Sequence, residues 1–348
     1  MLFVNARFLS QPVTGVQRYA IEICLCLKKI LHGQVCFVSP SNIIQKEIAQ
    51  ELGAISVGKH IGHAWEQIDL PIYLKKNGSP LLLCLCNTAP LYYKNKIVTV
   101  HDVAYKVFPQ TFNKSFLYVY KFMIPRIMKS AIKIITVSEF SKTEIIKYYD
   151  IDPNVIEVVY NAVSKEFKKV SSRNLQKRKY LLAVSSLNYR KNFVSVLKAF
   201  DIFEKINSET DLYIIGDLKN NNFKGIDIEQ YQSNPRIKFL GRVTDEELIY
   251  HYSIASGFIY PSLYEGFGIP PLEAQTCDCA VLAANIPPLR EVLGESALYC
   301  NPYDVYDIAN GMKKIIEQAS NYRQLGRENI KRFSWEKSAK KIAEACNL

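Results

Sequence analysis

Short apolar runs alternate with longer helix-like stretches along the whole of this 348-residue chain. That alternation is typical of parallel strands joined by crossover helices, so it predicts an α/β fold. The strands predicted in the first half are residues 2–5, 35–38, 81–86, 97–100, 132–137 and 156–160. Those predicted in the second half are residues 180–185, 212–215, 237–240, 257–260, 280–283 and 297–299.

A polar and basic segment, residues 164–179, separates the two groups of predicted strands. Because it is poor in apolar residues, we interpret it as an interdomain linker. The chain is long enough for two hydrophobic cores, so we predict a first domain at residues 1–163 and a second at residues 180–330. Ligands of open parallel sheets bind beyond the carboxyl ends of the strands, so we expect a cleft shared by the strand-to-helix loops of both domains.

The start of the chain does not resemble a secretory signal, since Arg7 and Arg18 interrupt its apolar stretches. No apolar run approaches the roughly 20 residues that cross a bilayer. We therefore expect a cytoplasmic protein. Its nine cysteines lack the C-x-x-C spacing of zinc and redox sites, so we expect reduced and mostly buried thiols.

The formal net charge is +11, and much of the excess lies between Lys106 and Lys133, where cations alternate with Phe and Tyr residues. A basic, aromatic segment of this kind can bind nucleic acid, rest on an anionic membrane surface or form a helix with a solvated face. The solvated face is the commonest outcome, and the membrane surface is the next alternative.

The strongest motif is Y-E-G-F-G-I-P-P-L-E-A at residues 264–274, directly after the predicted strand 257–260. Its glycines let the backbone approach a ligand, and its prolines suit the first turn of a helix whose free N–H groups favour anions or polar oxygens. Glu265 and Glu273 are about two turns apart, so they can reach different parts of one extended ligand. The alternative is a Gly/Pro turn with two solvated glutamates.

A second motif, S-S-L-N-Y-R-K-N at residues 185–192, follows the first strand of the second half. Adjacent cations in such a loop can neutralise a diphosphate and stabilise it as a leaving group. We therefore consider Arg190 and Lys191 candidates for this role, although an Arg-Lys pair taken alone is usually a solvated surface feature.

Two positions of the first half are further candidates. Gly15 stands between the opening strand and an apolar helix, where backbone N–H groups can meet a phosphate, although one glycine is most often just a turn. His101 ends the strand at residues 97–100, where its side chain can point into a cleft, although a lone histidine there is more often structural.

The E-x7-E pattern within E-G-F-G-I-P-P-L-E-A resembles the signature of retaining glycosyltransferase family 4. The resemblance implies the GT-B fold, in which two Rossmann-like domains with parallel sheets face each other across a cleft. It gives Glu265 a contact with the donor sugar and Glu273 a contact with the ribose. The loop amides that bind the sugar hydroxyls then belong to Gly266, Phe267, Gly268 and Ile269.

Other segments extend the resemblance over nearly the whole chain. Residues 185–192 are similar to the family's G-x-L-x-P-R-K-N, which implies that Arg190 and Lys191 bind the diphosphate, but Ser185 and Tyr189 replace the usual glycine and proline. Many relatives carry a further arginine earlier in this loop, and this chain has none there. The resemblance also places Gly15 against the donor phosphate, His101 against the donor sugar, and residues 331–348 in a last helix that packs back onto the first domain.

The segments V-T-V-H-D-V at residues 98–103, W-E-Q at 65–67 and Y-N-A at 160–162 resemble bacterial members that build surface polysaccharides such as O-antigen or capsule. The implied reaction moves a hexose or deoxyhexose, such as mannose or rhamnose, from a nucleotide-diphosphate sugar to a lipid-linked oligosaccharide at the inner membrane face. No Asp-x-Asp motif lies in a plausible loop, so we expect no metal. We also expect no other cofactor and no nucleic acid partner. The alternatives are a non-catalytic sugar- or nucleotide-binding protein and a nucleotide-sugar epimerase of the same fold.

Overall fold

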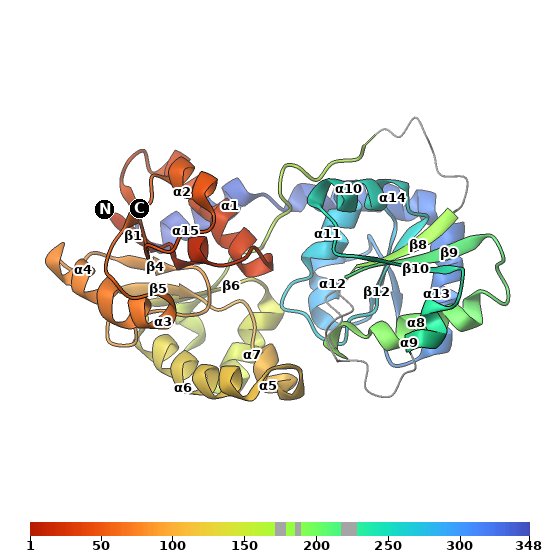
Figure 1. The fold of residues 1–348 in the computed structure, drawn as a ribbon, viewed down its shortest axis with the longest axis horizontal. Coiled ribbons are helices and arrows are strands. Elements are labelled where there is room, and N and C mark those ends of the chain that lie inside the picture. Colours follow the sequence, from red (N-terminus) through yellow and green to blue (C-terminus); the bar gives the residue numbers. More distant parts are fainter. Residues whose placement is uncertain (171–178, 185–188, 217–227) are drawn as a thin grey trace. The chain divides into compact units, whose positions relative to one another are not determined.

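The computed structural model describes residues 1–170, 179–184, 189–216 and 228–348. Within them the chain forms two compact units (Figure 1). The first unit contains Met1–Ala162 and Phe333–Leu348, and the second contains Val163–Arg332. Each unit is built on one sheet in which all pairs of described strands are parallel. The prediction of an α/β fold with two parallel sheets is therefore confirmed.

Seven described strands form the sheet of the first unit, in the order β3-β2-β1-β4-β5-β6-β7. The strands are β1 (Leu2–Asn5), β2 (Val35–Ser39), β3 (Ile55–Ser56), β4 (Leu82–Cys84), β5 (Lys96–Thr99), β6 (Lys133–Thr136) and β7 (Ile156–Val158). The helices are α1 (Gly15–Ile30), α2 (Lys46–Leu52), α3 (Gly62–Ala64), α4 (Leu70–Lys76), α5 (Ala104–Val107), α6 (Lys114–Ser130), α7 (Glu139–Tyr149) and α15 (Trp335–Ala345). A π-helical turn, η2 (Trp65–Asp69), joins α3 to α4.

Both faces of this sheet are buried, because successive strand residues point to opposite sides. Leu2 and Val4 of β1 pack into a core with α1, α2 and α15, whereas Phe3 packs into a second core with α4, α6 and α7. The residues after Arg332 thus return to the first unit, where Ser338 Oγ donates to the carbonyl of Tyr160 at 2.6 Å.

Six described strands form the sheet of the second unit, in the order β10-β9-β8-β11-β12-β13. The strands are β8 (Lys179–Val184), β9 (Thr210–Ile215), β10 (Ile237–Gly241), β11 (Gly257–Tyr260), β12 (Val281–Ala284) and β13 (Leu298–Cys300). The helices are α8 (Phe193–Phe203), α9 (Ile228–Gln232), α10 (Asp245–Ile254), α11 (Ile269–Thr276), α12 (Pro287–Leu293), α13 (Val305–Glu317) and α14 (Ala319–Asn329). A core of α8 and α13 side chains covers one face.

The strands match the predicted apolar runs closely, but two details differ. The two-residue strand β3 was not predicted, because Ile55 and Ser56 are both exposed and too few to show a periodicity. Of the predicted linker, residues 171–178 lie outside the described part, whereas residues 164–170 pack with the second unit. The backbone N–H of Val170, for example, donates to Ser253 Oγ at 3.1 Å.

Candidate active site

The second sheet reverses its strand order at β8. The chain runs outward from β8 through β9 and β10 and then returns to the other side of β8 with β11. Such a switch point places the loops after the two neighbouring strands side by side at the carboxyl edge, where α/β sheets bind ligands. The Arg190–Lys191 motif follows β8 and the Glu265 motif follows β11. Residues 185–188, which begin the first motif, lie outside the described residues.

The loop after β11 ends in a glycine that no other residue can replace without strain. Gly268 caps α11 with a φ of 101°, and a Cβ atom there would lie 2.6 Å from Leu289 Cδ2. This conformation is favourable only for glycine. It turns the chain into the first helical turn, with Pro270 at its second position. The residues between Glu265 and this turn, Gly266 and Phe267, are buried, and Ile269 is half-buried.

Glu265 is the centre of the polar contacts in this loop. Its Oε1 accepts hydrogen bonds from Lys191 Nζ at 2.6 Å, Tyr260 OH at 2.7 Å and Ser262 Oγ at 2.5 Å. Lys191 Nζ also donates to the Tyr260 hydroxyl oxygen at 2.8 Å. The site therefore holds one carboxylate, one ammonium and one phenol in mutual contact, and only 7% of the Glu265 side chain is exposed.

The charges around Glu265 keep it ionised. Burial by itself raises the pKa of a carboxyl group, but Lys191 and Arg190 oppose this effect and the pKa of Glu265 falls below its usual value. Burial and the adjacent Glu265 carboxylate raise the pKa of Tyr260 well above the usual range. Tyr260 is therefore a neutral donor and Glu265 an anion at physiological pH.

Main-chain and side-chain hydrogen bonds join the cationic loop to the loop after β11. Arg190 and Lys191 form the 3₁₀ turn η5 (Tyr189–Lys191), and Asn192 follows with a left-handed φ of 57°. The Asn192 side chain donates to the carbonyl oxygens of Pro261 at 3.0 Å and Pro302 at 2.6 Å. The carbonyl of Arg190 accepts from the backbone N–H of Leu263 at 2.8 Å. These bonds fix the position of the two cations relative to Glu265.

Glu273 lies on α11, away from the bonds that surround Glu265. Its Oε2 is 3.5 Å from the hydroxyl of buried Tyr252, and its side chain is partly exposed. Burial and the charge of Glu273 raise the pKa of Tyr252. The two glutamates therefore do not form a close acid/base pair. This agrees with their spacing in the sequence, which indicated that they reach different parts of one ligand.

The two candidate residues of the first unit lie in connections that follow β1 and β5. Gly15 is the first residue of α1, and a Cβ atom there would meet nothing within 4 Å. His101 follows β5 and is 8% exposed, and its Nε2 is 2.9 Å from the carbonyl oxygen of Leu85. Burial lowers the pKa of His101, so the ring is neutral at physiological pH.

Tyr260 and Ser262 are site residues that the sequence did not single out. Tyr260 is the last residue of an apolar strand and Ser262 stands in a short loop, so neither has a distinctive local pattern. The signal available was their distance along the chain from Glu265, five and three residues. An aromatic residue at the carboxyl end of a central strand is well placed to reach such a loop.

The first unit contains a second polar cluster, around Glu66 of the W-E-Q segment. Glu66 Oε1 accepts from Asn5 Nδ2 at 2.8 Å, Thr88 Oγ1 at 3.0 Å and Arg7 Nε at 3.3 Å, and Arg7 also donates to Thr88 Oγ1. Arg7 and Glu66 are both buried. Trp65 is a core residue whose indole N–H donates to the carbonyl of Val57 at 2.7 Å.

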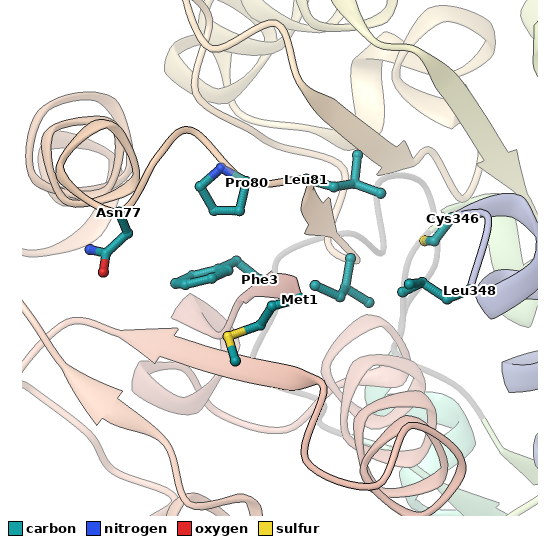
Figure 2. Close-up of a pocket in the computed structure, with 8 residues that line it drawn as sticks. Met1, Phe3, Asn77, Pro80, Leu81, Cys346 and Leu348 are labelled. Atoms are coloured by element: carbon teal, nitrogen blue, oxygen red, sulfur yellow. The ribbon is translucent and has the colours of Figure 1, made fainter.

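A cavity of about 500 Å³ lies at the amino-terminal end of the first sheet, beside the starts of β1 and β4 (Figure 2). Its lining is mainly apolar and consists of Met1, Leu2, Phe3, Asn77, Pro80, Leu81, Cys346 and Leu348. It contains none of the candidate site residues. Among the residues with described positions, no group of three or more His, Cys, Asp or Glu side chains is arranged to hold a metal ion.

Two family descriptions match consecutive parts of the chain. "Glycosyltransferase Family 4" matches residues 77–167, and "Glycosyl transferases group 1" matches residues 164–332, which include both motifs of the second unit. The chain belongs to glycosyltransferase family 4. This glycosyltransferase is similar to the O-antigen chain mannosyltransferase RfbU of Salmonella typhimurium. The two sequences are 28% identical over 335 residues, which cover 90% of each chain. It is also 26% identical to O-antigen chain mannosyltransferase B of Escherichia coli, over 98% of this chain and 97% of that one.

Solved structures agree with the fold of this glycosyltransferase. Anabaena HepE, in complex with UDP and glucose, has a TM-score of 0.75 at 18% identity and matches 99% of this chain and 98% of its own. WaaG, a glycosyltransferase involved in lipopolysaccharide biosynthesis, has a TM-score of 0.72 at 16% identity, with the same coverage. Both have the GT-B architecture of two parallel α/β sheets. No helix within the described ranges has the length and apolar character needed to cross a membrane.

Proposed function

We propose that this glycosyltransferase is a retaining enzyme that moves a hexose or deoxyhexose from a nucleotide-diphosphate sugar to a lipid-linked oligosaccharide in surface polysaccharide biosynthesis. The observation that carries the proposal is the contact of Lys191 with Glu265 at the switch point of the second sheet. Its similarity to two O-antigen mannosyltransferases along nearly their whole length supports O-antigen as the product and mannose as the sugar. Capsule and rhamnose remain the alternatives that we propose for the product and the sugar.

The leaving group is the nucleoside diphosphate, and the cations of η5 are its partners in this proposal. Lys191 and Arg190 lower the pKa of buried Glu265, so both exert a positive potential inside the site. A fixed positive charge stabilises a departing diphosphate without any reorganisation at the moment of reaction. These side chains and the helix N-termini therefore do the work for which other enzymes use a metal ion, and no cofactor is needed.

The donor sugar lies against the loop after β11 in this proposal. The ionised Glu265 offsets positive charge at the anomeric carbon and accepts from a sugar hydroxyl, while the amides of Gly266, Phe267, Gly268 and Ile269 donate to others. Glu273, which is partly exposed, binds the ribose.

Gly15 and His101 contact the same donor from the first unit in this proposal. The open space above Gly15 leaves the α1 N-terminus accessible to a phosphate. Burial lowers the pKa of His101, so its ring is neutral and a weak base. We therefore assign it a hydrogen bond to a sugar hydroxyl and not the role of a general base. The proton of the acceptor hydroxyl then passes to a phosphate oxygen of the donor, and attack from the face of the departing group retains the configuration.

We further propose that the enzyme works at the inner face of the cytoplasmic membrane, where α6 contacts anionic lipid. The helix has no acidic residue, and Tyr118 and Phe122 are 81% and 48% exposed. On the same exposed face lie Lys114, Lys121, Arg126 and Lys129. Exposed aromatic residues between cations suit the interface of an anionic bilayer, which would bring the enzyme to a lipid-linked acceptor.

A donor screen tests the reaction. The protein is incubated in chelator with GDP-mannose, dTDP-rhamnose, UDP-glucose and other nucleotide sugars, and free nucleoside diphosphate is measured. Slow release from one donor, and an α-linked product from an α-linked donor by NMR, are expected. Tight donor binding without release would instead identify a non-catalytic binding protein, and a new sugar nucleotide would identify an epimerase. Release that requires an added divalent metal would contradict the metal-independent part of the proposal.

A further inference from the structure

The three hydrogen bonds to Glu265 converge on one of its two oxygens. Lys191 Nζ, Tyr260 OH and Ser262 Oγ all donate to Oε1, at 2.6, 2.7 and 2.5 Å. Across the part of the chain with described positions, no other hydrogen bond to this carboxylate is present, so Oε2 accepts none from those residues. The protein therefore orients the carboxylate through one oxygen only.

We propose that Tyr260, supported by Ser262, is the positioning residue of this glycosyltransferase: it holds Oε1 of Glu265 so that Oε2 faces the donor sugar. The inference rests on the proposed function, because it assumes that Glu265 meets the donor. Tyr260 touches neither the sugar nor the diphosphate. It acts through Glu265 and through Lys191, which donates to its hydroxyl oxygen at 2.8 Å.

Lys191 interacts with two anions in this proposal, Glu265 and the diphosphate, and Tyr260 is required because of this. In the structure Lys191 pairs with Glu265, but in the donor complex the same ammonium also faces a diphosphate carrying more negative charge. Its attraction for Glu265 is then shared between two anions. Tyr260 and Ser262 are uncharged donors that stay on Oε1 whatever Lys191 binds. They keep the buried carboxylate oriented, and without them burial would favour its protonated form.

The phenol is suited to this task by its burial and its protonation state. Tyr260 is 3% exposed, and burial together with Glu265 holds its pKa well above the usual range, so the hydroxyl keeps its proton. A hydroxyl can accept from Lys191 and donate to Glu265 at the same time. Tyr260 thus fixes the direction of both charged groups, which a phenylalanine of the same shape cannot do.

The test compares two Tyr→Phe variants in the full-length protein. Tyr260→Phe removes the bond to Glu265. The matched control, Tyr231→Phe, removes a buried phenol that donates to Asp201 at 2.9 Å in the same unit, between α9 and α8. The measurements are nucleoside diphosphate release from the donor that the screen identifies, the Kd of that nucleoside diphosphate by calorimetry, and the melting temperature.

For Tyr260→Phe we expect turnover to fall about ten- to a hundredfold, the loss that follows from one charge-assisted hydrogen bond, with Kd changed less than about twofold. The acid limb of its turnover profile should move to higher pH, because Glu265 loses a donor. The charged groups that act on that carboxylate are Lys191 and Arg190. Its titratable neighbour Tyr260 is itself influenced by Glu265, Arg190 and Glu273. Ser262→Ala should act in the same direction, and Tyr231→Phe should keep wild-type turnover and pH profile.

Wild-type turnover and an unshifted acid limb in Tyr260→Phe would overturn the inference while leaving the proposed function intact. The inference would also be overturned if Tyr260→Phe lost turnover only in proportion to its loss of folded protein, and Tyr231→Phe lost as much. Failure of the wild-type protein to release nucleoside diphosphate from any donor would instead overturn the proposed function itself.

Discussion

The ammonium of Lys191 lies 2.6 Å from Oε1 of Glu265, although the two residues are 74 positions apart in the chain. Each charge stabilises the other in a site where both side chains are largely buried. Removing either partner leaves the other buried charge less compensated, which is costly in a medium of low polarity. The pair is therefore the point at which substitutions are most informative.

Lys191→Ala should lower turnover on the order of a hundredfold or more, because one charge opposite the leaving diphosphate is lost. The measurement is the rate of nucleoside diphosphate release at saturating donor. A circular dichroism spectrum and melting curve establish that the variant is folded. A rate close to that of the wild type would exclude Lys191 from the mechanism.

The same substitution should also change the pH dependence of the residual activity. In the wild type, Lys191 and Arg190 overcome the effect of burial and hold the pKa of Glu265 below its usual value, so Glu265 stays ionised into the acid range. Without Lys191 burial is less opposed and the pKa of Glu265 rises. The acid limb of the turnover profile should then lie at higher pH than in the wild type. An unchanged limb would mean that ionisation of Glu265 does not control it.

Glu273→Ala should mainly weaken nucleotide binding, by about ten- to a hundredfold, as expected for a hydrogen bond to a charged group. Glu273 is partly exposed and its contact with Tyr252 OH is long, at 3.5 Å, so its removal should cost little stability. Calorimetric titration with the nucleoside diphosphate is the measurement. A fall in turnover with donor affinity unchanged would contradict the ribose assignment.

Gly268→Ala should destabilise the second unit by at least about 1–2 kcal/mol, since φ is 101° and the new methyl group would meet Leu289 at 2.6 Å. Gly15→Ala is the matched comparison: a Cβ there meets no atom within 4 Å, so folding stability should be unchanged. Urea unfolding curves of both variants test this difference. Equal stabilities would contradict the conformation described for Gly268.

Binding to anionic liposomes should depend on the exposed face of α6. Replacing Lys114, Lys121 and Lys129 together by Glu should abolish flotation with phosphatidylglycerol vesicles, because each cation contributes about 1 kcal/mol at such a surface. The control carries the same charge change at three exposed lysines elsewhere in the first unit: Lys75, Lys76 and Lys340. Flotation that is insensitive to anionic lipid, or equally lost in both triple variants, would contradict the membrane surface on α6.

Local sequence patterns were enough to predict much of the fold. Each apolar run of the first half, such as residues 2–5 and 97–100, became a buried strand, because burial of both sheet faces requires continuous apolar sequence. Gly268 and Pro270 similarly marked the loop and the helix start at which they lie, since their allowed backbone angles are a local property. The edge strand β3 had no such pattern and was missed.

The sequence by itself determined the alternation of strands and helices, the family, and the set of charged residues in the strand-to-helix loops. Only the tertiary structure decided that Lys191, Tyr260 and Ser262 meet on a single oxygen of Glu265, and that Arg7 and Glu66 form a buried pair in the first unit. The physical reason is that apolar periodicity specifies backbone conformation and burial within one element. Contact between β8 and β11 loops depends instead on strand order, which is fixed by packing of the whole sheet.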